Sequence, residues 1–297
     1  MTLEHTTERR ARLDAVLHTD MGISAGLIRR LKWQNALFVN GEPAHTDRIV
    51  LPGDAVLVCI EESAEGFEPE PMALSILYED EAILAVDKPS GMLVHPSPQK
   101  NSGTLANGIL GYFRETGTAS AVHPVTRLDR DTFGVVLAAK TAHIHAKFCA
   151  LLKQGQMKKV YLASVFGAPA QDAGVIDIPV YKLGNGSLLR IADPRGKRAV
   201  TEYRVLQRYA QTALVELHPL TGRTHQLRLH CKATGFPILG DPQYHSPASA
   251  LFSAQHGLFT QQLCAAELSF VHPMTGESIV IRSAQSPLLP EVIDNSF

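Results

Sequence analysis

Two carboxylates and two guanidiniums stand between apolar runs at residues 127–134, and this octapeptide constrains the fold more than any other segment. It reads RLDRDTFG, with Pro124-Val125 before it and Val135-Val136-Leu137 after it. A carboxylate at the edge of an apolar core is costly unless a cation or hydrogen bonds compensate it. An arginine partner keeps such a group ionised and fixes its direction. The segment is therefore either a turn with surface ion pairs or a site that holds an aspartate as nucleophile or base.

Three more segments combine glycine, proline, aromatic and charged residues in short motifs. They read DKPSGMLVHP at 87–96, KVYLA at 159–163, and GRTHQLRLH at 222–230 followed by PILGDPQY at 237–244. With the octapeptide they resemble, in the same order, the motifs of RNA pseudouridine synthases of the RluA type, the ribosomal large subunit pseudouridine synthases. Those motifs are KPxGxxVHP, RLDxxTSG, KxYxA and GRTHQxRxH…PxxGDxxY, and four of them in order are far more specific than any one alone.

Two positions depart from the family pattern. Thr126 replaces the His that usually precedes the RLD sequence, and Phe133 replaces the small residue before Gly134. Neither substitution touches Asp129, but either one can alter how the loop packs or which RNA it accepts.

The resemblance implies an α+β fold in which an antiparallel-rich mixed sheet carries the catalytic site. Runs of strands with few intervening helices agree with this fold and argue against a doubly wound sheet. Strands are expected at 82–86, 160–166, 175–181, 188–192, 200–206 and 212–218, with a turn at Asn185-Gly186, and helices are expected after Thr104, at 141–154 and at 224–234, the last capped by Thr224.

The resemblance also implies the reaction and three of its residues. Such enzymes break the glycosidic bond of a uridine in structured RNA and rejoin carbon 5 of the uracil to the ribose, which isomerises uridine to pseudouridine. Because substrate and product hold the same atoms, neither a cofactor nor a metal is required. Asp129 matches the nucleophile or ribose-directed base, Arg228 matches the arginine that pairs with it, and Tyr161 matches the aromatic residue against the uracil.

Elementary chemistry agrees with these roles. An ionised Asp129 is needed near neutral pH, and a neighbouring guanidinium such as Arg228 favours the charged carboxylate. The Tyr161 ring can stack on a flipped base, and its hydroxyl can take part in proton transfer from carbon 5. Attack of Asp129 on the anomeric carbon and removal of a ribose proton both stay open.

Three further residues of these motifs are candidates for RNA contacts. Arg127 either holds a backbone phosphate or braces the catalytic loop. Arg223 and His225 either face the RNA or form hydrogen bonds within their motif, with internal support favoured for His225. Lys88 is expected in the scaffold around the site with a minor contact to the RNA, and Lys159 as a surface charge at a strand end.

Residues 1–60 are expected to form a small module of their own. Two short helices, a hairpin at Asn40-Gly41 and a strand at 55–60 resemble the alpha-L RNA-binding module first known from a small-subunit ribosomal protein. Ser24 can cap the second helix. A basic face on that helix would bind phosphates and position RNA without reading its sequence, whereas the alternative is a solvated face. The cations that lie largely off its apolar stripe are Arg29, Arg30 and Lys32.

The formal net charge of −1 looks wrong for a protein that binds RNA, but the charge is unevenly distributed. Residues 61–82 hold eight acids and no Lys or Arg, and without them 28 basic residues face 21 acidic ones. A local basic surface is therefore compatible with the total charge. Within this acidic stretch residues 61–72 are expected to be a linker, which leaves residues 73–297 for the catalytic domain.

Several further features bound the function. No apolar run is long enough to span a bilayer, and residues 1–12 lack an apolar signal-peptide core, so the expected location is the cytoplasm. Cys59, Cys149, Cys231 and Cys264 are far apart in sequence, which favours reduced thiols over disulfides or zinc. Ribosomal or transfer RNA is the expected partner of a monomer that needs no nucleotide cofactor and no membrane.

Two other functions are compatible with the sequence. A non-catalytic RNA-binding or ribosome-assembly protein could retain the fold, but it would not need Asp129, Tyr161 and Arg228 together. An unrelated aspartate-dependent hydrolase could use Asp129 and Asp131, since positions two apart on an extended strand share a face. Such a hydrolase would leave the motifs around Tyr161 and Arg228 unexplained.

Overall fold

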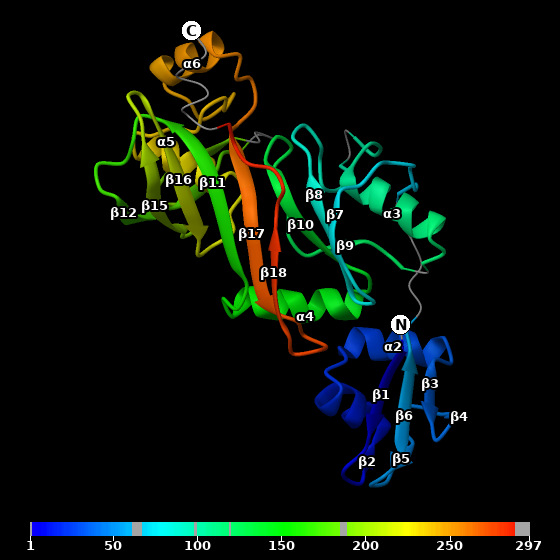
Figure 1. Cartoon of the computed structure of the whole chain (residues 1–297). Helices are drawn as coiled ribbons and strands as arrows, with labels where there is room; N and C mark the ends of the chain where they lie inside the picture. Colours follow the sequence, from blue (N-terminus) through cyan, green and yellow to red (C-terminus); the bar gives the residue numbers. More distant parts are fainter. Residues whose placement is uncertain (1, 61–66, 98–99, 119, 185–188, 289–297) are drawn as a thin grey trace.

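The structure of the chain is a computed structural model that describes residues 2–60, 67–97, 100–118, 120–184 and 189–288. Its main feature is a ten-stranded mixed sheet, and a smaller sheet lies in the amino-terminal part (Figure 1). The strands of the main sheet are β7 (Ile76–Glu79), β8 (Ile83–Lys88), β9 (His123–Pro124), β10 (Phe133–Ala139), β11 (Lys158–Phe166), β12 (Ala173–Asp177), β15 (Val200–Arg208), β16 (Thr212–Pro219), β17 (Leu263–Val271) and β18 (Ser278–Arg282).

The main sheet is almost entirely antiparallel. Its strand order is β12-β15-β16-β11-β17-β10-β8-β7, with β18 paired to β17 and β9 paired to β10. Within the described residues β10 and β17 form the one parallel pair of this sheet. The antiparallel-rich α+β fold predicted from the sequence is therefore confirmed.

Strand β10 lies in the middle of one half of the sheet and is buried along its whole length. Because successive side chains of a strand point to opposite faces, its residues serve two cores. Val135 and Leu137 pack in a core with Phe148 of helix α4 (Ala142–Lys153), whereas Val136 packs in a core with helix α3 (Leu105–Glu115). The uninterrupted apolar run of β10 thus reflects burial on both faces.

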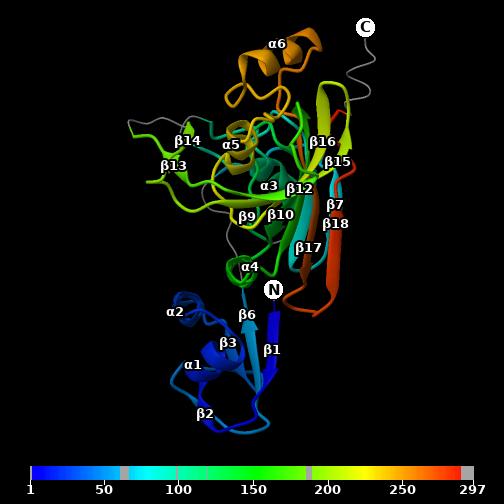
Figure 2. The ribbon, with the colours of Figure 1, turned by 90° about the vertical axis from the view of Figure 1, so that its left-hand side faces the viewer.

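The other half of the sheet is covered by helix α5 (Gln226–Ala233). Leu227 and Cys231 of this helix pack on Ala163 and Val215 of strands β11 and β16. Figure 2 shows α3 and α5 on the same side of the sheet. The cores beneath the two helices meet at the side chain of Tyr161, which packs against both. On this face of the sheet, Tyr161 therefore lies at the boundary between the part covered by α3 and the part covered by α5.

Residues 67–72, the described end of the expected linker, lie along α3. The backbone N–H of Glu70 donates to the Asn107 carbonyl at 3.0 Å, and its carboxylate accepts from the Gly103 N–H at 2.9 Å. The close approach depends on Gly111, because a Cβ there would lie 2.0 Å from the Glu70 carbonyl oxygen. This stretch is packed against the catalytic domain, and residues 61–66 lie outside the described part of the chain.

The amino-terminal module has its own hydrophobic core. Its sheet has the strand order β1-β6-β3-β4, and Ser24 caps its longest helix by accepting a hydrogen bond from the Leu27 N–H at 3.3 Å. Asn40 and Gly41 have φ values of 54° and 81°, as a tight two-residue hairpin requires. The elements are β1 (Thr2–Thr6), β2 (Ala11–Arg12), α1 (Leu13–Ala15), the π-helical turn η1 (Val16–Asp20), α2 (Ala25–Trp33), β3 (Leu37–Val39), β4 (Glu42–Pro43), β5 (Ile49–Val50) and β6 (Ala55–Cys59).

Two predicted elements need correction. Thr224 does not cap α5, because the residue before the helix is His225, which has a φ of 57° and forms no side-chain cap. The strand expected at 175–181 is two strands, β12 and β13 (Val180–Lys182), separated at Pro179, which has no N–H to donate. Strand β13 pairs with β14 (Arg190–Ala192) in a separate hairpin.

The turn expected at Asn185-Gly186 and the first residue of the strand at 188–192 lie outside the described residues. Several described elements were not expected from the sequence. Among them are β1, β9, β18 and helix α6 (Pro247–Gln255).

Gly134 makes the parallel pairing of β10 and β17 possible. It lies opposite Ala265 with a φ of 106°, a conformation that L side chains rarely adopt. A Cβ at this position would lie 2.4 Å from the Ala265 carbonyl oxygen. The glycine that ends the octapeptide is therefore a requirement of close strand packing just after the Asp129 loop.

We expect Gly134→Ala to lower the free energy of unfolding by about 2–5 kcal/mol, because a left-handed backbone and an overpacked contact both act against it. Urea unfolding measures the loss. The matched control is Gly117→Ala, where φ is 68° and the space around the new Cβ is open. The control should lose only about 1–2 kcal/mol. Equal losses in both variants would show that the approach to Ala265 is unimportant.

Candidate active site

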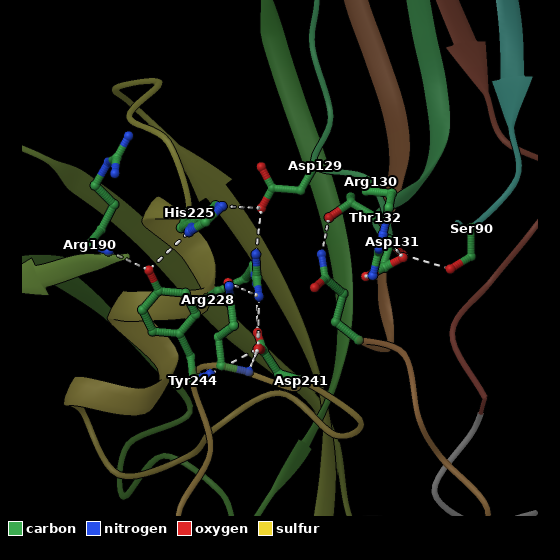
Figure 3. Close-up of polar contacts among 12 residues, drawn as sticks. Ser90, Asp129, Arg130, Asp131, Thr132, Arg190, His225, Arg228, Asp241 and Tyr244 are labelled. Atoms are coloured by element: carbon green, nitrogen blue, oxygen red, sulfur yellow. Dashed lines mark hydrogen bonds and ion pairs between the residues drawn. The ribbon is translucent and has the colours of Figure 1, made fainter. Parts of the chain in front are cut away.

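Arg228 lies at the centre of the site and binds two carboxylates from different parts of the chain (Figure 3). Its Nη1 donates to Asp129 Oδ2 at 3.0 Å. Its Nε and Nη2 donate to Asp241 Oδ2 and Oδ1 at 2.7 and 2.8 Å, which forms a bidentate pair. Nη2 also donates to Gln243 Oε1 at 3.1 Å. The structure thus brings Asp129 and Arg228 together and adds a carboxylate that the sequence had not singled out.

The three charges differ in their access to water. The Asp241 side chain has no exposed surface and that of Arg228 is 5% exposed, whereas Asp129 retains 26%. Burial raises the pKa of Asp241, but the hydrogen bonds and charge of Arg228, together with two backbone N–H groups, hold this pKa below its usual value. Arg228 and Asp241 therefore form a charged pair inside the protein, and Asp129 is the member of the cluster that meets solvent.

A second chain of hydrogen bonds approaches the same carboxylate through His225. The backbone N–H of Arg190 donates to the Tyr244 hydroxyl at 2.8 Å, and this hydroxyl lies 2.9 Å from His225 Nδ1. His225 Nε2 lies 3.8 Å from Asp129 Oδ2, the oxygen that Arg228 binds. The Tyr244 oxygen accepts a hydrogen bond from the Arg190 N–H, so the phenolic proton is left to donate to His225 Nδ1. The proton of the neutral imidazole then lies on Nε2, which faces Asp129.

The two oxygens of Asp129 consequently have different surroundings. Oδ2 faces Arg228 Nη1 and His225 Nε2, whereas Oδ1 accepts no hydrogen bond from the residues that the structure describes. Figure 3 shows one oxygen directed at the cluster and the other directed away from it. Burial lowers the pKa of His225. The charges of Asp129 and Asp241 raise this pKa and those of Arg228 and Arg190 lower it, and the net shift is downward. The imidazole ring is therefore neutral near pH 7. Of the two Asp129 oxygens, Oδ1 is the one left open to a substrate.

Tyr161 lies on β11, opposite Ala265 of β17, and Ala265 in turn lies opposite Gly134 of β10. Tyr161 therefore stands two strands from the residue that ends the octapeptide. Burial raises the pKa of Tyr161, and the charge of Asp129 raises it further. The phenol is accordingly protonated near neutral pH and lies within reach of the Asp129 charge.

Asp131, the other carboxylate of the octapeptide, is directed away from Asp129 (Figure 3). Its two oxygens accept from Arg130 Nε and Nη2, each at 2.9 Å. Its backbone carbonyl accepts from Ser90 Oγ at 3.0 Å. Within the described residues Asp129 and Asp131 bind different arginines and form no hydrogen bond with each other. The two carboxylates therefore do not have the geometry that a hydrolase using both would need.

Lys88 fixes the octapeptide to the scaffold. It is fully buried, and burial lowers its pKa to about 8 although the charges of two nearby aspartates oppose the shift. Because its ammonium group binds three backbone carbonyls inside the protein, Lys88 is scaffold, as predicted, but the minor RNA contact predicted for it is wrong because the side chain is fully buried. Those carbonyls belong to Pro89, Met92 and Arg130, at 2.9, 2.8 and 2.9 Å.

The two departures from the family pattern support the loop from inside the protein. Thr126 Oγ1 accepts a hydrogen bond from the Leu137 N–H of β10 at 2.9 Å. Phe133 begins β10, is buried, and lies opposite Cys264 of β17. Both side chains therefore hold the octapeptide against the sheet.

Two polar residues of the GRTHQLRLH segment are structural. Gln226 Nε2 donates to the Val200 carbonyl and to Thr201 Oγ1, each at 3.0 Å. The ring nitrogens of His230 lie 2.9 Å from Thr201 Oγ1 and 2.9 Å from the Ile178 carbonyl. These side chains attach α5 to strand β15 and so fix the position of Arg228.

The other candidate residues of the catalytic domain lie at different depths. Arg127 is exposed and forms no hydrogen bond or ion pair with any described residue, so it does not brace the loop through them. Arg223 is exposed, and its Nε donates to the Arg198 carbonyl at 3.2 Å. Lys159 is half-buried near Gly222, and burial lowers its pKa, which corrects its expected place on the surface.

Arg29, Arg30 and Lys32 are exposed on α2 of the amino-terminal module, far along the chain from the Asp129 cluster. The opposite side of this helix is buried through Leu27, Ile28 and Leu31. The predicted basic face is thus present as a surface.

None of the described helices combines the length and apolar character that a membrane crossing requires. In the same part of the chain no three His, Cys, Asp or Glu side chains come together in a way that could hold a metal ion. All four cysteines are free thiols, as predicted, with Cys231 and Cys264 buried and Cys59 and Cys149 half-buried.

Comparison with known proteins gives a consistent result. A family model described as RNA pseudouridylate synthase matches residues 82–233. The uncharacterized RNA pseudouridine synthase YjbO of Bacillus subtilis is 35% identical over 263 residues, which cover 88% of this chain and 90% of that protein. The ribosomal large subunit pseudouridine synthase D of Pseudomonas aeruginosa is 34% identical over 263 residues, which cover 86% of this chain and 81% of that protein.

Solved structures agree with the fold. Human RNA pseudouridylate synthase domain containing 4 superimposes with a TM-score of 0.57 at 28% identity, over 72% of this chain and 89% of that one. Human RNA pseudouridylate synthase domain containing 1 gives a TM-score of 0.60 at 24% identity, over 75% of this chain and 89% of that one.

We expect Arg228→Met to lower the free energy of unfolding by about 3–5 kcal/mol at pH 7, because Asp241 is left buried and unpaired. In the wild type the pKa of Asp241 is lower in the folded protein than in the unfolded chain, where it is about 4. The ionised carboxylate therefore stabilises the fold above that pH, and this stabilisation is lost as the pH falls. In the variant, burial without a cation raises the folded pKa, so the cost is absent at low pH and grows as the pH rises.

Denaturant unfolding of both proteins between pH 7 and about 4 tests this expectation, since the difference between them should shrink as the pH falls. Arg223→Met is the matched control, because Arg223 is an exposed cation five positions away. A difference that does not change with pH would show that Asp241 does not depend on Arg228.

Proposed function

The chain belongs to the RNA pseudouridylate synthase family, and we propose that it isomerises uridines of ribosomal RNA at the site around Asp129. One observation carries the proposal for this site: Asp129 Oδ2 is held by Arg228 while Oδ1 is open. Similarity to ribosomal large subunit pseudouridine synthase D supports ribosomal RNA as the substrate. In this proposal the chain acts as a monomer in the cytoplasm.

Asp129 begins the reaction as an ionised carboxylate. The C1′–N1 bond of the uridine breaks, the uracil turns, and a C1′–C5 bond forms, after which the C5 proton is lost and N1 holds a proton. Oδ1 either attacks C1′ or removes a ribose proton, and both routes need the charge that Arg228 maintains. Arg228 is a positioning residue here, since its bond to Oδ2 leaves Oδ1 directed outward.

Tyr161 supplies the platform for the uracil and a proton carrier for the later step. Its ring lies between the two helix-covered cores, where a flipped base can stack on it. Burial and then the charge of Asp129 raise the pKa of its phenol. When the first step consumes the Asp129 charge, the phenol becomes more acidic, so it can give its proton to N1 and then, as the phenolate, take the proton from carbon 5.

RNA contacts surround this centre in the proposal. Arg127 and Arg223 are exposed and bind backbone phosphates near the target uridine. His225 supports Asp129 from inside the motif, since its Nδ1 is engaged by Tyr244. The amino-terminal module acts as an alpha-L RNA-binding domain whose α2 cations bind phosphates farther along the RNA.

The expected result for Asp129→Asn is a loss of activity of at least about 10³-fold without a change in melting temperature, because the amide keeps the shape and loses the nucleophilic charge. Release of tritium from RNA labelled at uridine carbon 5 measures turnover. Asp131→Asn carries the same chemical change two positions away and should stay within about tenfold of wild type, since its partner Arg130 is largely exposed.

The same pair of variants separates the alternatives. A hydrolase that uses both aspartates would lose activity in both variants, and a non-catalytic RNA-binding protein would release no tritium even as wild type. Pseudouridine mapping of total RNA from cells that lack the protein then tells ribosomal from transfer RNA as the substrate.

A third variant, Tyr244→Phe, removes the hydroxyl that donates to His225 Nδ1. The ring then becomes easier to protonate, and a charged imidazolium would pair with Asp129 and weaken it as a nucleophile. Arg228, Arg190 and Asp241 face the same ring and are unchanged by this substitution. We expect single-turnover rates of the variant to fall as the pH is lowered from about 8 to 6, while those of the wild type stay flatter.

The control is Tyr244→Phe combined with His225→Gln, because a glutamine amide can donate to Asp129 and does not titrate. Its rates should not depend on pH in this range. Superimposable pH profiles for wild type and Tyr244→Phe would show that the His225 tautomer has no influence on Asp129.

A further inference from the structure

Trp33, the only tryptophan of the chain, is almost fully exposed. It is the last residue of α2, and 81% of its surface is open to solvent. Tryptophan is usually among the more buried residues of a protein, and an indole left in water forgoes a large hydrophobic gain. Its exposure therefore calls for a partner that covers the ring.

The position of Trp33 on the helix decides the kind of partner. Residues three and four positions apart are neighbours on a helix surface, so Trp33 lies beside Arg29 and Arg30. All three are exposed on the side of α2 opposite its buried stripe, and Lys32 is exposed next to them. The sequence of α2 contains no acidic residue. The indole is thus the single large ring of a cationic surface.

This composition fits RNA better than a protein partner. The residues after Trp33, Gln34 and Asn35, are also exposed and polar, so the chain that continues from the ring adds no apolar side chain beside it. Protein interfaces are enriched in tryptophan and arginine, but they are depleted of lysine and have an apolar centre. Single-stranded nucleic acid, in contrast, is bound by cations along its backbone and by aromatic rings on which its bases stack.

We propose that Trp33 is a stacking platform for an unpaired base of the substrate RNA, with phosphates on either side bound by Arg29, Arg30 and Lys32. This inference rests on the RNA-binding role proposed for the amino-terminal module. It predicts that the module prefers unpaired to paired RNA. The cations bind the phosphates of both, whereas the indole ring adds affinity only where a base is free to stack. The module then directs the enzyme to RNA with a loop or single-stranded segment farther along the RNA from the target uridine.

Because Trp33 is the only tryptophan, its fluorescence reports on this surface without labelling. The full-length protein is titrated with a single-stranded uridine-containing oligoribonucleotide and with the fully paired duplex of the same sequence. We expect the single strand to quench the emission and the duplex to bind with little quenching. Strong quenching of the free protein by acrylamide is also expected, since the ring is open to water. Protection from acrylamide before RNA is added would overturn the proposal.

Two substitutions complete the test. Trp33→Ala should weaken binding of the single strand by about 5- to 150-fold and leave duplex binding unchanged, whereas Trp33→Phe should retain most of the affinity. Neither should change the salt dependence, which Arg29→Ala should flatten by about 0.7 in the log–log slope. Equal affinity of wild type and Trp33→Ala for the single strand would refute the platform.

These measurements involve no turnover, so they are independent of the reaction proposed at Asp129. If tritium release depends on Asp129 but Trp33 shows no quenching, only the stacking platform fails. If quenching is found without tritium release, the binding surface stands and the proposed reaction fails.

Discussion

The structure of the site depends on one guanidinium that joins two carboxylates. Arg228 comes from α5, Asp129 from the octapeptide and Asp241 from the loop after α5, so the cation connects three segments. A buried charge is tolerated only when it is paired and hydrogen-bonded, and Asp241 provides that pairing with bidentate geometry. Without this internal partner, Arg228 would be a buried cation whose only carboxylate partner is the partly exposed Asp129.

The two partners of Arg228 show how Asp129 can be fixed and still be free for the role proposed for it. Arg228 binds Asp129 Oδ2, and Oδ1 accepts no hydrogen bond from the described residues, so the direction of the carboxylate is set while one oxygen stays unbound by them. The backbone supports the same end, because the close pairing of Gly134 with Ala265 starts the central strand directly after the loop. Lys88 holds the loop from the opposite side. Asp129 and its loop are therefore held by contacts with three separate segments, which are α5, β17 and the end of β8.

The sequence predicts those parts of the molecule whose causes are local. Ser24 as a helix cap and the Asn40-Gly41 hairpin were found because each depends on a few neighbouring residues. The motifs also led to Asp129 and Arg228. In contrast, Asp241 was overlooked because its role exists only when α5 and the following loop meet, and the parallel pairing of β17 with β10 was overlooked because β10 lies about 130 residues earlier. Lys159 was misplaced because its burial depends on the folded structure and is not visible in the neighbouring sequence.

Geometry also explains why an arginine occupies position 228. Three of its nitrogens form four hydrogen bonds, to two carboxylates and to the Gln243 amide, and they do so in one plane. A lysine ammonium at the same place could supply the charge, but it is a compact point and cannot bind Asp241 in bidentate fashion while reaching Asp129. The shape of the guanidinium, in addition to its charge, therefore lets it bind the buried Asp241 and the partly exposed Asp129 at the same time. A single cation can thus stabilise the fold and orient the carboxylate that we propose acts on the uridine.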